Sequence, residues 1–150
     1  MIVRRDSAHV VLTIGALVTI IGSLCPWVAS GTVDRSSYEV IDLVDRLGFA
    51  ESGPVGVALR AWPLMPLLVV TGPVAMWWRR RVVGLALSVT GAVYAAAVAL
   101  TVRLAPSTGL LRIRFGWIVT LAGAVVMLAG TLVALIPAGR ARADQSAGLG

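Results

Sequence analysis

Acidic side chains gather in one short stretch of the chain, DRSSYEVIDLVDRLGFAESG at residues 34–53. Five of the seven acidic residues lie in it, namely Asp34, Glu39, Asp42, Asp45 and Glu51. Carboxylates three residues apart on a helix share one face, where they could bind a metal ion or act as a general acid and a general base. The stretch contains no His, Cys or Asn to join them. We therefore expect no catalytic, metal or cofactor site here, and predict that the acids keep an exposed helix face solvated.

The spacing of residues in this stretch predicts the helix that carries the acids. Ser36 and Glu39 form a capping-box pattern, which starts a helix. One apolar stripe follows at helical spacing, made of Val40, Ile41, Val44 and Leu47. The opposite side carries Glu39, Asp42, Asp45 and Arg46. We predict a helix over residues 37–47 that rests its apolar stripe on a helical bundle or on the membrane interface. Gly48 should end it, and ESGPVG at residues 51–56 should be a loop.

Uncharged runs fill most of the remaining chain and indicate what positions this helix. The chain is 58% hydrophobic and 13% charged, and that is about half the charge of a soluble domain. The uncharged runs lie at about residues 8–28, 61–78, 82–102 and 115–138. With a rise of ~1.5 Å per residue, each can cross a hydrocarbon layer of ~30 Å as a helix. We predict an all-α fold, a transmembrane four-helix bundle at residues 1–138. Residues 29–60 would form its extracytoplasmic loop and residues 139–150 a disordered cytoplasmic tail.

The tryptophans coincide with the predicted ends of these runs. All five lie there: Trp27, Trp62, Trp77, Trp78 and Trp117. Tryptophan rings favour the headgroup region of a membrane, so we expect all five at the two membrane surfaces. Arg4 and Arg5 before an apolar run could also mark a signal peptide. The apolar part is longer than in most signal peptides, and Trp27-Val28-Ala29 lacks the small residues of a cleavage site, so we predict a retained anchor.

The arginines indicate an orientation for these helices. All thirteen basic residues are arginine, and with both termini in the cytoplasm seven lie inside and six outside. The short turn Arg79-Arg80-Arg81 and the arginine pair before the first run favour this arrangement. We predict a multi-pass protein of the bacterial plasma membrane with cytoplasmic N- and C-termini. The net charge of +6 could suggest nucleic-acid binding, but arginines beside apolar runs are typical of membrane proteins. The lipid bilayer, and not nucleic acid, is the expected partner.

Ionisable groups are missing from the middle of all four runs, although transport and membrane catalysis usually need them within the bilayer. We expect no enzyme activity, and expect hydroxyls such as that of Tyr94 to satisfy a neighbouring carbonyl. Small residues instead recur every four positions at Gly84, Ser88, Ala92 and Ala96, and again at Gly116, Thr120 and Ala124. Such stripes let helices approach closely. We predict that they hold this bundle together in preference to binding a partner's helix.

Two further patterns lie within the apolar runs. The segments GALVTIIGSL at 15–24 and GAVVMLAGTL at 123–132 share the pattern G-A-x5-G-[ST]-L. This is either an internal repeat or a chance match between runs rich in Gly and Ala. The second run contains Pro66 and Pro73 in its interior. Each proline removes a backbone donor, kinks a helix and frees a carbonyl that could line a cleft.

The phrase LCPWVASGTVDRSSYEVIDL at residues 24–43 resembles a group of small four-span actinobacterial membrane proteins of uncharacterised function. The shared features are a Pro-Trp at the end of the first run and a polar loop after it. The resemblance covers the first run and this loop, and the rest of the chain more loosely. It implies a four-span membrane fold and no particular activity.

Two functions of different classes follow from these patterns. The first is a non-enzymatic accessory or interaction subunit of the bacterial inner membrane, which contacts another membrane or extracytoplasmic protein. Its candidate surface consists of Tyr38, Glu39, Asp42, Asp45, Arg46, Arg60 and Trp62. The alternative is a small transporter or a protein that binds lipid or a small molecule, with a cleft near Pro66 and Pro73.

Overall fold

Helices make up most of the protein in the computed structural model, which describes residues 2–46, 53–104 and 111–135. Three helices are long and apolar enough to cross a membrane: α1 (Ile2–Leu24), α5 (Arg81–Leu104) and α6 (Gly116–Leu135). The run predicted at 61–78 forms a shorter apolar rod, in which the 3-10 turn η1 (Trp62–Leu64) leads into α4 (Met65–Trp77). The prediction of long apolar helices is confirmed for three runs, and the four membrane crossings stay a prediction. The predicted tail, residues 139–150, lies outside the described residues.

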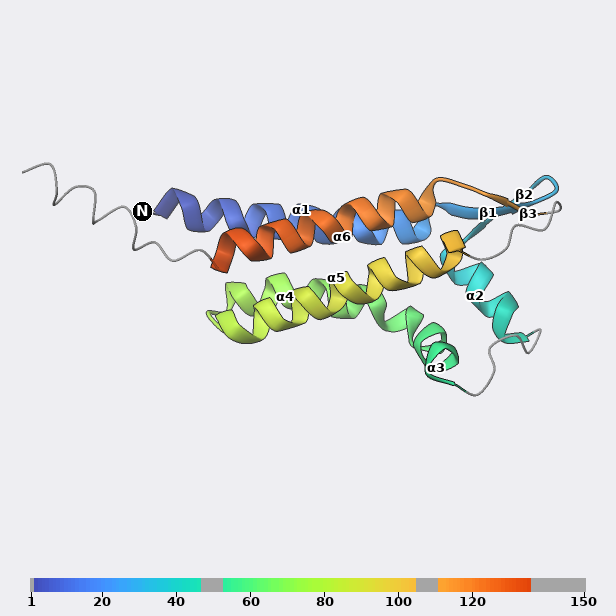
Figure 1. Cartoon of the computed structure of the whole chain (residues 1–150). Helices are drawn as coiled ribbons and strands as arrows, with labels where there is room; N and C mark the ends of the chain where they lie inside the picture. The colour runs from blue at the N-terminus through green and yellow to red at the C-terminus, as the bar shows by residue number, and fades with distance from the viewer. Residues whose placement is uncertain (1, 47–52, 105–110, 136–150) are drawn as a thin grey trace, which may run out of the picture.

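The four apolar helices pack lengthwise, α1 against α6, α4 against α5, and α5 against α6 (Figure 1). Glycines make the α1–α6 contact close. A Cβ added to Gly22 would lie 2.4 Å from the backbone nitrogen of Thr120, and one added to Gly123 would lie 2.4 Å from that of Thr19. At these points the two backbones touch with no side chain between them, a form of packing that associates helices in lipid.

The two segments that share the pattern G-A-x5-G-[ST]-L face one another in this contact. Gly15 lies against Met127, and Gly123 lies against Thr19. These two contacts correspond when one segment is aligned with the other, because Gly15 matches Gly123 and Thr19 matches Met127. Each segment therefore presents the same small-residue face to its antiparallel neighbour, and this gives the shared pattern a structural reason.

The predicted small-residue stripes also pack inside the bundle. A Cβ on Gly72 would lie 2.3 Å from Ser88 Oγ, and one on Gly84 would lie 2.8 Å from the Gly72 carbonyl oxygen. The buried members of the stripes are Gly84, Ser88, Ala92, Gly116, Thr120 and Ala124. Ala96 is half-buried. The prediction that these residues hold this bundle together is confirmed.

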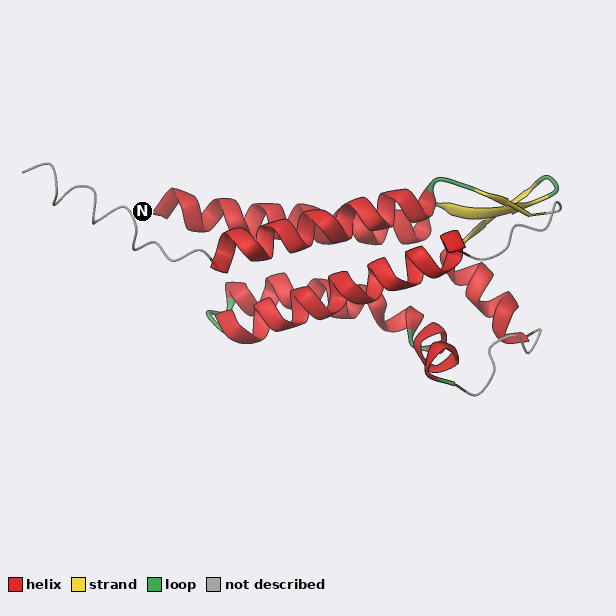
Figure 2. Ribbon diagram, viewed as in Figure 1, coloured by secondary structure: helices red, strands yellow, loops and turns green. Residues whose placement is uncertain are grey.

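A three-stranded antiparallel sheet stands at one end of the helices and corrects the prediction of an all-α fold (Figure 2). Its strands run in the order β2-β1-β3 and are β1 (Pro26–Ser30), β2 (Val33–Ser36) and β3 (Leu111–Ile113). The first apolar run was predicted to continue as helix to residue 28, but α1 ends at Leu24. Pro26 explains the difference, because proline cannot donate the next helical hydrogen bond and disfavours helical geometry at Cys25. Gly31, at φ +61°, then begins the two-residue turn to β2.

Two short helices complete the region beside the sheet. The first, α2 (Ser37–Arg46), agrees with the predicted helix over residues 37–47, although residues 47 and 48 lie outside the described part. The second, α3 (Pro54–Arg60), corrects the prediction of a loop at ESGPVG. Proline is favoured in the first turn of a helix, where no intrahelical donor is needed. We call the sheet, α2 and α3 together the head.

The opposite end of the bundle carries the start of α1, the end of α6 and the turn between α4 and α5 (Figure 1). Arg79 adopts φ 63° in this turn. The backbone nitrogens of Arg79 and Arg80 donate to the carbonyls of Met76 and Ala75, at 3.2 and 3.0 Å. This pattern ends α4 as a Schellman motif. The Arg81 guanidinium donates to the carbonyl of Ala134 and so joins the turn to the end of α6.

Candidate interaction surface

The start of α2 follows directly from β2 and is fixed by the predicted capping pair. Glu39 Oε2 accepts hydrogen bonds from the Ser36 backbone nitrogen at 2.7 Å and from the Ser36 hydroxyl at 3.1 Å. These two bonds, the backbone one first, lower the pKa of Glu39 below its ordinary value, and the nearby Arg35 lowers it further. Glu39 is therefore a charged capping group that holds the strand-to-helix junction.

The two faces of α2 divide as the sequence predicts. Ile41 is buried, and Val40 and Val44 are half-buried. The exposed side carries Glu39, Asp42, Asp45 and Arg46. The acids therefore coat the solvent-facing side, while the apolar stripe seats the helix.

Buried hydrogen bonds attach α2 to the bundle through Ser37. The Ser37 hydroxyl donates to the carbonyl of Ser23 at 2.6 Å, and Trp62 Nε1 donates to the same hydroxyl oxygen at 2.9 Å. The chain Trp62–Ser37–Ser23 links η1, α2 and α1. Ser37 and Trp62 are both fully buried, so these bonds satisfy polar groups that water cannot reach.

An aromatic cluster surrounds the hydrogen-bonded chain Trp62–Ser37–Ser23. Two of its tryptophans lie inside the protein and not, as expected, among lipid headgroups. Trp27 and Trp62 were expected at the membrane surface, but each is 0% exposed, and their rings meet edge to face with centroids 5.6 Å apart. The rings of Tyr38 and Tyr94 lie tilted beside Trp62, with centroids 6.4 and 5.7 Å from its centroid. Trp27 Nε1 also donates to the Gly22 carbonyl at 2.8 Å. The rings turn inward because β1, α2 and α5 provide a protein interior where the sequence suggested only lipid headgroups.

The other three tryptophans remain outside this cluster. Trp77 and Trp78 are 84% and 78% exposed, and Trp117 is half-buried beneath the guanidinium of Arg103, 6.0 Å from its ring centroid. The prediction that hydroxyls in the runs bond to a neighbouring carbonyl is confirmed for Tyr94, whereas the buried Ser88 hydroxyl has no partner among the described residues. The Tyr94 hydroxyl donates to the Ala58 carbonyl at 2.5 Å and ties α5 to α3.

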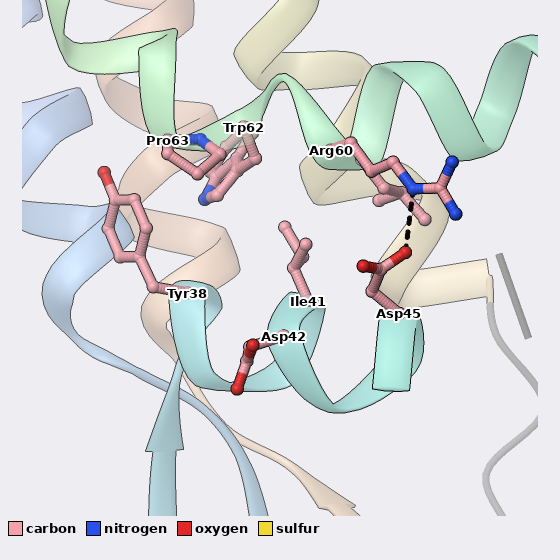
Figure 3. Close-up of a pocket in the computed structure, with 8 residues that line it drawn as sticks. Tyr38, Ile41, Asp42, Asp45, Arg60, Trp62 and Pro63 are labelled. Carbon is pink, nitrogen blue, oxygen red and sulfur yellow. Dashed lines mark hydrogen bonds and ion pairs between the residues drawn. The ribbon is translucent and has the colours of Figure 1, made fainter. Parts of the chain in front are cut away.

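A pocket of about 350 Å³ opens between α2 and the α3–η1 segment (Figure 3). Its lining brings together five members of the predicted surface with three apolar residues: Tyr38, Ile41, Asp42, Asp45, Leu59, Arg60, Trp62 and Pro63. Figure 3 shows the Ile41 side chain pointing across the pocket toward the segment that carries Trp62, and Asp45 facing Arg60. Glu39 and Arg46 do not line the pocket and lie on the exposed side of α2.

Arginines form ion pairs with three aspartates of the head. Arg60 Nε lies 2.8 Å from Asp45 Oδ1 and joins α3 to α2, and Arg46 Nε lies 2.9 Å from Asp42 Oδ2. Sequence reasoning missed the first pair, because it joins residues fifteen apart with no periodic signal. A third pair, Arg114 to Asp34 at 3.0 Å, links the end of β3 to β2. All these side chains are at least 45% exposed, so each pair contributes only tenths of a kcal/mol, about 1 at most.

The described carboxylates of the head all take part in structural contacts. Within the described residues, no group of three His, Cys, Asp or Glu side chains is placed to hold a metal ion. Glu51 lies outside that part of the chain. The carboxylates serve as helix cap, ion-pair partners and solvated surface. The surface of the head is mixed in character. Its pocket is lined by aromatic and aliphatic side chains and by the charged Asp42, Asp45 and Arg60.

The prolines of the second run lie apart from this pocket. Pro66 occupies the first turn of α4 and not the helix interior, which corrects the predicted kink at that position. The helix begins only at Met65, because Pro63 and Pro66 both favour a helix start. Pro73 is inside α4, as predicted, and neither Pro66 nor Pro73 lines the pocket.

Comparison with known proteins gives no family for the chain. No protein-family model matches it, no curated protein matches it, and no solved structure matches it.

Proposed function

We propose that this protein crosses a bacterial plasma membrane four times and acts as a non-enzymatic accessory subunit, presenting its head to a partner protein outside the cytoplasm. Support for membrane insertion comes from three helices of sufficient length and apolar character. Their outward side chains are largely aliphatic, for example Ile14, Leu17, Val93, Leu100, Ile118 and Val125, all more than one third exposed.

The fourth crossing is supported by the packing and length of α4. Its 13 residues and the three of η1 rise about 25 Å together, a few ångströms less than a hydrocarbon layer of ~30 Å. Local bilayer thinning accommodates such a shortfall at modest cost. Because α4 packs lengthwise against α5, a crossing by α5 carries α4 through the same layer.

The orientation is supported by where the two kinds of charged group lie. The start of α1, the end of α6 and the turn with Arg79, Arg80 and Arg81 share one end, and a short arginine-rich turn favours the cytoplasmic side. The described acids that form ion pairs, together with Glu39, lie at the head end. The head would therefore face away from the cytoplasm.

The observation that carries the interaction role is the rigid attachment of an exposed mixed surface. The chain Trp62–Ser37–Ser23 and the bond from Tyr94 to Ala58 hold α2 and α3 to the bundle, while the charged side of α2 stays exposed. A surface that is already ordered loses less conformational entropy when it binds. Tyrosine and arginine, which line the pocket here above the buried Trp62, are among the residues enriched in the energetic centres of interfaces.

The test is site-specific photo-crosslinking in native membranes. A photo-reactive residue at Leu43, 39% exposed on α2, should form an adduct with a second polypeptide, and one at Val93 on α5 should not. The yield should fall in the double variant Asp42→Ala, Arg46→Ala. It should persist in the matched double variant Asp34→Ala, Arg114→Ala, which removes an ion pair from the sheet side of the head. Recovery of self-contacts alone from Leu43 would contradict the proposal.

The pocket specifically favours a second candidate, a protein that binds lipid or a small molecule. The sequence also predicted a function of this class, with a cleft near Pro66 and Pro73. The pocket lies instead beside Trp62. Leu59→Trp would fill the pocket without removing a charged group. If the pocket holds an amphiphile, this variant should lose a molecule that copurifies with the wild-type protein, and equal retention by both proteins would exclude the candidate.

A further inference from the structure

The turn between α4 and α5 exposes aromatic and cationic side chains side by side. Trp77 and Trp78 are 84% and 78% exposed, and Arg79 and Arg80 directly follow them and are exposed too. The ion pairs found among the described residues all belong to the head, at the other end of the bundle. Within that part of the chain, Arg79 and Arg80 form no ion pair, so their charges lack a protein counter-ion.

The backbone of this turn is held in one conformation. Arg79 is the one non-glycine residue with positive φ among those described, and the hydrogen bonds to Met76 and Ala75 fix it there. A side chain in this conformation is strained relative to glycine. Glycine is the usual residue at this position of a helix end. Arg79 therefore places a charged side chain at a position where the backbone conformation favours glycine.

The three arginines of the turn differ in what they contact. Arg81 is used within the fold, because its guanidinium donates to the Ala134 carbonyl. Arg79 and Arg80 remain available to a ligand at the boundary of the apolar helices. Guanidinium groups bind phosphate oxygens through two parallel hydrogen bonds, and tryptophan rings favour the headgroup layer.

We infer that this turn is a binding site for the headgroup of an anionic phospholipid. Arg79 and Arg80 would contact its phosphate oxygens, and Trp77 and Trp78 would lie among the adjoining glycerol and acyl groups. A zwitterionic lipid also offers a phosphate, but its ammonium group offsets the attraction. An arginine near an anionic membrane surface contributes about 1 kcal/mol, or roughly a fivefold enrichment of anionic lipid for each arginine. This inference rests on membrane insertion and is independent of any partner at the head.

The experiment reads the lipid next to Trp77 and Trp78 through quenching of their fluorescence. The full chain with Trp117→Phe is reconstituted in phosphatidylcholine vesicles that contain either brominated phosphatidylglycerol or brominated phosphatidylcholine at equal mole fraction. Because Trp27 and Trp62 are fully buried, the turn supplies the lipid-facing reporters. Phosphatidylglycerol should quench more strongly. The excess should be lost in Arg79→Gly, Arg80→Gln, a variant whose glycine also relieves the positive φ and so favours folding.

A matched variant separates this site from a general effect of charge. Arg46→Gln, Arg60→Gln removes the same number of charges from the head and should keep the excess quenching. Equal quenching by the two brominated lipids, an excess that survives loss of Arg79 and Arg80, or an excess lost equally in the head variant would each overturn the inference. Inorganic phosphate added at constant ionic strength should leave the excess unchanged. Its removal by phosphate would show a site for free anions, and the lipid assignment would be wrong.

Discussion

At the scale of single residues, tryptophans with the same sequence context have opposite environments. Trp62 and Trp77 both stand at an end of the second apolar run, yet Trp62 is 0% and Trp77 84% exposed. Position in a run predicts only that the residue lies near a membrane surface. Whether the ring faces protein or lipid depends on the segments that fold over it. For Trp62 these are α2 and the sheet, whose approach to η1 no local pattern reveals.

Ser37 should be essential to this environment although it is one small hydroxyl. In Ser37→Ala the indole nitrogen of Trp62 and the carbonyl of Ser23 both lose a buried hydrogen-bond partner. We expect the free energy of unfolding in detergent micelles to fall by about 1–3 kcal/mol. The same chemical change at the exposed Ser30, Ser30→Ala, should alter it by less than about 0.5 kcal/mol. Equal effects of the two changes would show that the chain Trp62–Ser37–Ser23 does not stabilise the head.

The cap formed by Glu39 should make the start of α2 sensitive to acid. Its pKa in the folded protein lies below the ordinary value of 4.5 because the Ser36 amide and hydroxyl favour the carboxylate. The stabilisation is therefore fully present above about pH 4.5 and is lost as pH falls through the lower folded value. The amide NMR signal of Ser36 should titrate in that range. It should be independent of pH in Glu39→Gln, and identical behaviour of the two proteins would contradict the cap.

At the scale of elements, whether an element can be predicted from the sequence depends on how far apart in the chain its contacting residues are. The helix α2 is read from the sequence because its cap and its stripe, Ser36 with Glu39 and Ile41 with its neighbours, are local. The strand β1 is hidden within an apolar run, and its partners β2 and β3 lie far apart in the chain. The sheet forms because β1 pairs with β2, which directly follows it, and with the distant β3; Val28, for example, pairs with both Arg35 and Ile113. The pocket was missed for the same reason, because it needs α3 and η1 beside α2.

The glycine contact between α1 and α6 should limit what the bundle tolerates. A methyl group in Gly123→Ala would lie 2.4 Å from the Thr19 backbone nitrogen, so the helices would have to separate. We expect a loss of about 1–3 kcal/mol in the free energy of unfolding. Gly91→Ala is the matched control, because its nearest neighbour is Val69 Cγ2 at 3.3 Å, a contact that needs only a small shift to relieve. Alanine's higher helix propensity should make that change neutral or stabilising, and equal losses would refute the close contact.

At the scale of the whole molecule, the structure is a polarised rod with different chemistry at its two ends. The head contains ion pairs between acids and arginines and encloses an aromatic cluster. The other end exposes Trp77 and Trp78 beside Arg79 and Arg80, which form no ion pair among the described residues. The sequence indicates this polarity only weakly, since its arginines divide almost equally between the ends. The ion pairs of the head explain part of that balance, because Arg60 and Arg114 are matched there by Asp45 and Asp34.

The most direct test of this account is the sidedness of the head and the turn. Single cysteines at Val33 in the head and at Arg80 in the turn, each in a Cys25→Ser background, can be labelled with a membrane-impermeant maleimide. We expect the cysteine at 33 to react in intact cells and the one at 80 to react only after the membrane is opened. Reaction of both positions from the same side would show that α4 does not cross the bilayer, and would contradict the four-span arrangement.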